Sequence, residues 1–142
     1  MNSKKFLIGT LVGGIVFFFL GYLFYGVALA SFFKQHSAAV SGSMKTMDQI
    51  LWWALILGNL ASGALLTYIF LKMANITSFG KGASTGAAIG FFMALSMELI
   101  RFAVDNGPDL TATLTAVVVG TVMTAIAGGA IGAVLGTGKK PA

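Results

Sequence analysis

Four apolar segments, each long enough to cross a lipid bilayer, place the strongest constraint on how this chain can fold. A transmembrane helix needs about 20 mostly apolar residues to cross a hydrocarbon core about 30 Å thick. We expect helices over residues 6–33, 49–73, 82–104 and 110–136. Strand alternation is absent from these segments, so an open sheet or a barrel is not expected. The sequence predicts an all-α membrane protein, a bundle of four transmembrane helices.

Composition supports a membrane location and a single domain. Of the 142 residues, 57% are hydrophobic and only 9% are charged, whereas soluble domains carry about 25% charged residues. We therefore expect residues 1–142 to form one transmembrane domain with the lipid bilayer as its environment. The chain has no cysteine, which excludes disulfides, iron–sulfur ligation and thiolate zinc sites. We expect no cofactor and no bound metal.

The first apolar segment resembles a signal peptide in its order of features but is too long to be one. Its apolar run of about 24 residues follows Lys4 and Lys5, and the apolar region of a signal peptide is about 7–15 residues long. We expect a retained transmembrane helix.

The basic residues predict the orientation of the helices, because cytoplasmic loops of membrane proteins are enriched in Lys and Arg. With the N-terminus inside, six basic residues lie on the cytoplasmic side and three on the outer side. The inner residues are Lys4, Lys5, Lys72, Lys81, Lys139 and Lys140, and the outer ones are Lys34, Lys45 and Arg101. These lysines lie singly or in pairs beside the apolar segments and form no patch, so no nucleic-acid partner is expected.

The connections complete the predicted topology. The links after the second and third segments are short, which favours antiparallel neighbours and a bundle built from two helical hairpins. We expect both termini in the cytoplasm, an outer loop over residues 34–48 and a cytoplasmic tail over 137–142. The predicted location is the bacterial inner membrane, crossed several times.

Small residues recur at every fourth position in the last two predicted helices. Such rows form a smooth groove that lets another helix approach closely. The residues predicted to pack are Gly82, Gly86, Gly90 and Ala94 in one helix and Gly120, Thr124, Gly128 and Gly132 in the other. We expect the two grooves to face each other, and Thr121 and Thr124 to bond to their own helix backbone.

Glu98, Arg101 and Asp105 form one charged stripe, because their spacings of three and four residues place them on one helix face. Glu98 lies about 10 Å deeper than Asp105 along the helix. A carboxylate at that depth needs Arg101, a hydroxyl such as that of Tyr22, Tyr25 or Thr113, or protonation. The stripe could fix the depth of the helix at the outer membrane–water interface, or Glu98 could bind and transfer protons or ions.

Two further polar residues are candidates for a structural or a functional role. Asn59 is predicted near the midplane, where its side chain needs a protein partner. A hydrogen bond to a neighbouring helix is one interpretation, and part of a polar pathway is the other. His36 stands in the predicted outer loop without metal-ligand neighbours, so we expect it to be structural or solvated. Ser43 is the expected N-cap of the second helix.

Catalytic signatures are missing from the sequence. Gly80 and Lys81 lack the upstream glycine and the following Ser or Thr of a phosphate-binding loop. No nucleophile has both a histidine and a carboxylate plausibly beside it. We do not expect an enzyme.

Three short resemblances accompany these residues. Leu20-Gly21-Tyr22-Leu23-Phe24-Tyr25-Gly26 resembles the opening helix of a family of small bacterial four-helix integral membrane proteins without an assigned biochemical function. Gly58-Asn59-Leu60-Ala61-Ser62-Gly63 and Ser96-Met97-Glu98 are similar to pieces of four-helix fluoride channels. The chain lacks those channels' threonine- and phenylalanine-rich break. Small multidrug exporters also combine four helices with one membrane glutamate, but they carry it in the first helix.

The sequence supports two functional hypotheses. The first is a small inner-membrane protein that acts by helix association, as a homo-oligomer or as an accessory subunit of a larger membrane complex. Its partners would be other transmembrane helices. The alternative is a homo-oligomeric ion- or proton-coupled transporter or channel that uses Glu98 together with Asn59 and the neighbouring tyrosines.

Overall fold

The computed structural model describes residues 2–36 and 47–137 and is all-helical. The elements are α1 (Ser3–Gly21), η1 (Tyr22–Ala28), α2 (Ala30–His36), η2 (Met47–Gln49), α3 (Trp52–Ile69), η3 (Phe70–Ala74), α4 (Phe79–Val104) and α5 (Leu110–Gly136). The expected N-cap Ser43 and the outer residue Lys45 lie outside the described residues.

Four helices are long and apolar enough to cross a membrane, which confirms the main expectation from the sequence. They cover Ser3–Ala28, Trp52–Ala74, Phe79–Val104 and Leu110–Gly136. Helix α4 begins at Phe79, three residues before the expected start at 82, because the Ser78 hydroxyl accepts a hydrogen bond from the Lys81 amide and caps it.

The first segment differs from the single helix expected over residues 6–33. Helix α1 continues as the π-helix η1, and the helical backbone is interrupted at Leu29, whose φ is −116° and ψ is 12°. The short helix α2 then starts at Ala30. The interruption lets the chain change direction between η1 and α2, so His36 reaches the end of the bundle where α5 begins.

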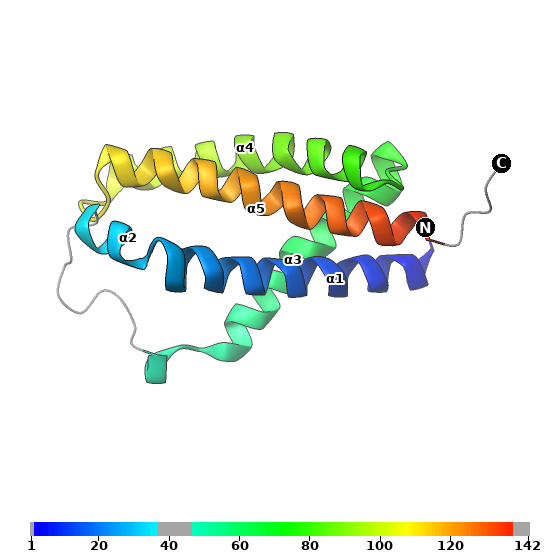
Figure 1. Ribbon diagram of the computed structural model, residues 1–142, viewed down its shortest axis with the longest axis horizontal. Coiled ribbons are helices and arrows are strands. Elements are labelled where there is room, and N and C mark those ends of the chain that lie inside the picture. The colour runs from blue at the N-terminus through cyan, green and yellow to red at the C-terminus, as the bar shows by residue number, and fades with distance from the viewer. Residues whose placement is uncertain (1, 37–46, 138–142) are drawn as a thin grey trace.

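The four spanning helices pack in the order α3, α1, α5, α4 (Figure 1). Helix α4 packs almost wholly on α5, and α1 lies between α5 and α3. Although a short link joins α3 to α4, α3 packs mainly on α1 and crosses it obliquely. The hairpin expected from that short link is therefore not the main contact of α3. Helices α3 and α4 stand at the two edges of the molecule.

The apolar core lies where α1, α3, η3 and α5 come together. Its buried members are Phe17, Leu66, Phe70, Ile76, Ala127, Ile131 and Leu135. Towards its own beginning α3 diverges from this core, and Trp53 there is 65% exposed. The core is therefore confined to one half of α3, and the other half has a large surface open to lipid or to another helix.

Glycines allow the helix backbones to approach closely at two interfaces. A Cβ atom on Gly128 of α5 would collide with the backbone carbonyl oxygen of Gly82 in α4. A Cβ atom on Gly63 of α3 would lie 2.6 Å from the Gly14 nitrogen and 2.6 Å from the Thr10 carbonyl oxygen in α1. Backbone atoms cannot move aside as a flexible side chain can, so both contacts require glycine.

Three threonine hydroxyls at these interfaces are satisfied within their own helices, whereas the buried Thr10 Oγ1 of α1 has no hydrogen-bond partner among the described residues. Thr121 Oγ1 donates to the Val117 carbonyl at 2.8 Å, and Thr124 Oγ1 donates to the Gly120 carbonyl at 2.7 Å. The buried Thr67 does the same with Gly63 at 2.7 Å. The expectation that Thr121 and Thr124 bond to their own backbone is confirmed, and such bonds let polar residues pack between helices without water.

Candidate functional site

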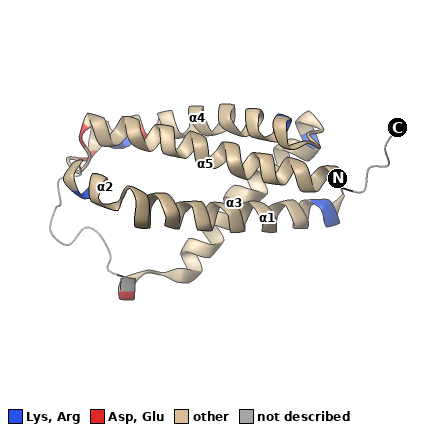
Figure 2. Ribbon diagram, viewed as in Figure 1, with Lys and Arg blue, Asp and Glu red and all other residues tan. Residues whose placement is uncertain are grey.

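Charged residues lie mainly at the two ends of the bundle, and one end carries basic residues without carboxylates while the other carries both signs (Figure 2). The start of α1, the end of α5 and the start of α4 lie together, because Lys5 Nζ donates to the Leu135 carbonyl and Ser78 lies against Gly132. We call this the lysine end; its described charged residues are Lys4, Lys5, Lys72 and Lys81. The opposite end, which we call the acidic end, contains Glu98, Arg101, Asp105 and Asp109, with Lys34 and His36 of α2 beside them.

The predicted charged stripe is present at the acidic end. Arg101 Nη1 lies 3.9 Å from Glu98 Oε2, and Arg101 Nε lies 3.7 Å from Asp105 Oδ2. The Glu98 side chain is only 22% exposed, against 54% for Arg101 and 49% for Asp105. Asp105 Oδ1 also accepts the Gly107 amide at 3.0 Å, which closes the turn after α4. One guanidinium therefore links the half-buried carboxylate to the turn.

Of the two tyrosines expected near this stripe, Tyr25 is the one that reaches it. Its phenol in η1 lies within electrostatic range of both Glu98 and Arg101. Its ring packs against Phe33 of α2, with the centroids 5.2 Å apart. Tyr22 instead is 61% exposed on the surface of η1. Thr113 is fully buried and donates to the Asp109 carbonyl at 2.9 Å.

His36 and Asp109 form a contact at the acidic end that the sequence analysis did not predict. His36 Nδ1 lies 2.8 Å from Asp109 Oδ2, and the Asp109 amide donates to the His36 carbonyl at 2.9 Å. The other carboxylate oxygen of Asp109 accepts the Ala112 amide at 2.7 Å and caps α5. Two hydrogen bonds thus hold the end of α2 against the start of α5. The one sequence signal was an aspartate directly before an apolar helix, on the same predicted side as the only histidine.

Hydrogen bonds hold the pKa of the Asp109 carboxyl below its ordinary value of 3.8. The amide of Ala112 contributes most, followed by the His36 ring. Both favour the ionised form, the first by donating to it and the second also by charge when protonated. Because the pKa in the folded protein is lowered, this stabilisation is present above the ordinary pKa and is lost as the pH falls through the lowered one.

We expect acidification below about pH 4 to lower the unfolding temperature of the native protein in detergent more steeply than that of Asp109→Asn. The asparagine can still cap α5 but cannot ionise. The measurement is thermal unfolding followed by circular dichroism between neutral and acidic pH. Equal slopes for the native protein and Asp109→Asn would contradict a stabilising role for the ionised carboxylate.

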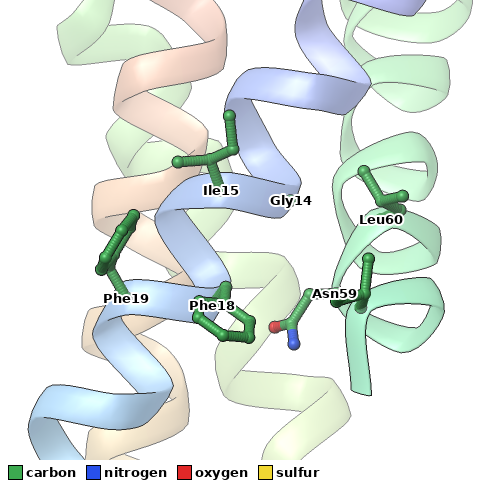
Figure 3. Close-up of a pocket in the computed structure, with 7 residues that line it drawn as sticks. Gly14, Ile15, Phe18, Phe19, Asn59 and Leu60 are labelled. Carbon is green, nitrogen blue, oxygen red and sulfur yellow. The ribbon is translucent and has the colours of Figure 1, made fainter. Parts of the chain in front are cut away.

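Asn59 lies away from both charged ends and faces α1. Figure 3 shows its side chain pointing towards Phe18 across the space between α3 and α1. This space is an apolar hollow of about 220 Å³, lined by Gly14, Ile15, Phe18, Phe19, Ile56, Asn59 and Leu60. Asn59 Nδ2 donates to the Leu55 carbonyl of its own helix at 2.8 Å. The hydrogen bond that we expected to run to a neighbouring helix therefore runs within α3.

The residues predicted to pack all lie at one interface, between α4 and α5. The Gly82 and Gly86 backbones meet those of Gly128 and Thr124, and Gly90 meets the Thr124 side chain. Further along, a Cβ atom on Gly120 would lie 3.0 Å from the Ala94 Cβ. Gly132 packs against the Ser78 carbonyl, just before α4 begins. The structure brings these eight residues together and separates them from Asn59.

Within residues 2–36 and 47–137, no three His, Cys, Asp or Glu residues are grouped so that they could hold a metal ion. The pairs at the acidic end can instead hold helices in place and, at Glu98, present a shielded carboxylate. Comparisons of the chain with protein-family models, with curated proteins and with solved structures find no match.

Proposed function

We propose that this protein is a small integral protein of the bacterial inner membrane that acts by helix association. Its partner is a second copy of the chain or the transmembrane helices of a larger complex, in which it serves as an accessory subunit. This proposal rests on four apolar helices with little mass outside them, and on the way in which their surfaces are used.

The observation that carries the proposal is the exposure of the edge helix α4. Only 6% of the most apolar 18-residue stretch of α4 is buried inside the molecule, whereas 39% of the corresponding stretch of α5 is buried. Its outer surface includes Phe92, which is 69% exposed, and the polar Ser84 and Ser96. At the other edge, Gly58 of α3 has nothing within 4 Å of a Cβ position. Small and hydroxylated residues on an exposed membrane helix favour contact with another helix.

The lysine end supports an orientation with both termini in the cytoplasm. The lysine end carries four lysines, Lys4, Lys5, Lys72 and Lys81, and no carboxylate among the described residues. Positively charged ends of membrane proteins remain on the cytoplasmic side. A reporter fused after residue 142 is the test. Activity of an exclusively periplasmic reporter would contradict this orientation.

We expect the protein purified in a mild detergent to have a mass above one chain, either as a homo-oligomer or with a foreign subunit in fixed ratio. Native mass spectrometry distinguishes the two outcomes, because a homo-oligomer has a mass that is a whole multiple of 14.7 kDa and a complex with a foreign subunit does not. Ala88→Phe, on the exposed face of α4, should reduce the associated fraction by steric hindrance, with Val118→Phe on the exposed side of α5 as the control. A monomer at all protein concentrations would contradict the proposal.

The alternative function is proton- or ion-coupled transport through Glu98. A specific observation favours it: the Glu98 side chain is 22% exposed and lies beside Arg101 and within electrostatic range of Tyr25. A partly buried carboxylate paired with a cation inside a membrane helix is typical of residues that line ion or proton pathways. The same contacts are also compatible with a purely structural role for the Glu98–Arg101 ion pair, which is the role that we favour.

We expect Glu98→Gln to leave proton flux into liposomes unchanged and to lower the unfolding temperature by a few degrees, since Arg101 retains Asp105 at 3.7 Å. The measurement is fluorescence of a pH-sensitive dye enclosed in proteoliposomes. Asp105→Asn, at the outer boundary of the same stripe, is the matched control. If the native protein conducts protons, and flux is lost in Glu98→Gln while its mass and unfolding temperature are retained, the transport alternative replaces the leading proposal.

A further inference from the structure

The lysine end contains a hollow that neither functional hypothesis uses. It has a volume of about 280 Å³ and lies between the start of α1 and the end of α5. Its polar lining residues include Asn2, Lys4 and Lys5, and its apolar lining residues include Ile8, Val134 and Leu135. The volume is several times the roughly 30 Å³ occupied by one water molecule in the liquid. The hollow therefore has room for a chemical group that is polar on one side and apolar on the other.

The charges around the hollow select an anion. Lys5 Nζ donates one hydrogen bond to the Leu135 carbonyl at 3.4 Å, which holds the ammonium over the end of α5 and leaves its other two N–H groups available. Lys4 is exposed beside it. The carboxylates of Glu98, Asp105 and Asp109 lie at the opposite end of the described bundle, so they do not neutralise these lysines.

The depth of the hollow selects an amphipathic ligand. Both helices that form it reach the limits of their apolar spans there, α1 at Ser3 and α5 at Gly136. Its lysines are therefore at the level of the lipid headgroups, and Ile8 lies about one turn deeper along α1. A free anion would satisfy the ammonium groups but would leave the exposed parts of Ile8 and Val134 in contact with water.

We propose that this hollow binds one anionic phospholipid, with the headgroup phosphate on Lys4 and Lys5 and the first acyl methylenes against Ile8 and Val134. Basic pockets between transmembrane helices on the cytoplasmic side suit anionic headgroups of this kind. A zwitterionic lipid is a poorer occupant, because its headgroup has no net negative charge and would bring a positive ammonium group near Lys4, Lys5 and the other lysines of this end. The site is independent of any oligomer and of Glu98.

The test compares two double variants that remove the same charge from the same end. The protein in mild detergent is titrated with phosphatidylglycerol, and native mass spectrometry measures the bound lipid. We expect Lys4→Gln/Lys5→Gln to bind about 30-fold more weakly, since each lysine near an anionic headgroup contributes about fivefold. Lys72→Gln/Lys81→Gln, whose lysines do not line the hollow, should retain binding within about twofold. Unfolding temperatures establish that both variants fold.

Three outcomes would overturn the proposal. Equal losses in the two double variants would mean that only the total charge of the lysine end matters. Equally strong binding of phosphatidylcholine with the same acyl chains would mean that binding does not depend on the charge of the headgroup. Displacement of the lipid by millimolar inorganic phosphate would mean that the lysines bind phosphate without the acyl chains. If Lys4→Gln/Lys5→Gln does not fold, Lys4→Gln alone provides the test, with an expected loss of about fivefold.

Discussion

Gly128→Val is expected to prevent the packing of α4 on α5 and to destabilise the protein by about 3 kcal/mol. A Cβ atom at this position would meet the Gly82 backbone carbonyl, and Gly86 Cα lies 3.1 Å away from it. Neither atom can move without displacing the whole of α4. Since α4 packs almost wholly on α5, no other described helix holds it with a comparable contact. Thermal or denaturant unfolding in detergent, followed by circular dichroism, measures the loss.

Gly58→Ala is the matched control for this substitution. Gly58 also lies within a transmembrane helix, but nothing lies within 4 Å of its Cβ position. Alanine there should be neutral or stabilise the helix by up to about 1 kcal/mol, because glycine is a poor helix former. If Gly128→Val were as stable as Gly58→Ala, the close contact of α4 and α5 would be contradicted.

Gly63→Val is expected to separate α3 from α1 while leaving α4 packed on α5. The new Cβ atom would lie 2.6 Å from backbone atoms of both Gly14 and Thr10, so the helices must move apart. We expect a loss of about 3 kcal/mol, since backbone collisions at a packed contact cost at least as much as overpacking a core. Because α4 and α5 contact each other at separate residues, this loss should be local to α3.

The absence of cysteine from the chain allows this local loss to be measured directly. Leu66→Cys, at a position only 2% exposed in α3, should react with a maleimide in the Gly63→Val background but not in the native one. Ala116→Cys, one turn from Gly120 in α5, should stay protected in both. Ser62→Val, beside Gly63 but on the exposed surface, is the control substitution. Reactivity at both cysteines would contradict separate packing of the two pairs.

Features that depend on residues close in sequence could be predicted from the sequence. Apolar length indicated four membrane-spanning helices, and the bounds of α5 are those expected, 110–136. The spacing of four residues between Gly82, Gly86 and Gly90 places them on one helix face, and in the structure that face lies on α5. The stripe of Glu98, Arg101 and Asp105 follows from the same periodicity.

Features that depend on distant residues could not be predicted. His36 and Asp109 are 73 positions apart, and their contact requires the interruption at Leu29 that lets α2 change direction. Asn59 bonds within α3 because α3 crosses α1 obliquely and leaves a hollow instead of a polar neighbour. No pattern in one helix fixes the angle at which it crosses another, since that angle is set by the side chains of both.

The central place of α5 has a consequence for biogenesis. The helix with the largest buried share, 39%, is also the one that follows α1, α3 and α4 in the chain. While the ribosome is still making α5, α1 and α3 can already pair through Gly63. Phe17 and Phe70 then lack the α5 residues that cover them in the finished core, Ala127, Ile131 and Leu135. Helix α4 meanwhile has no partner. The nascent chain must therefore keep an unfinished assembly in the membrane until α5 inserts, and a pause or truncation before residue 110 would yield helices without a common core.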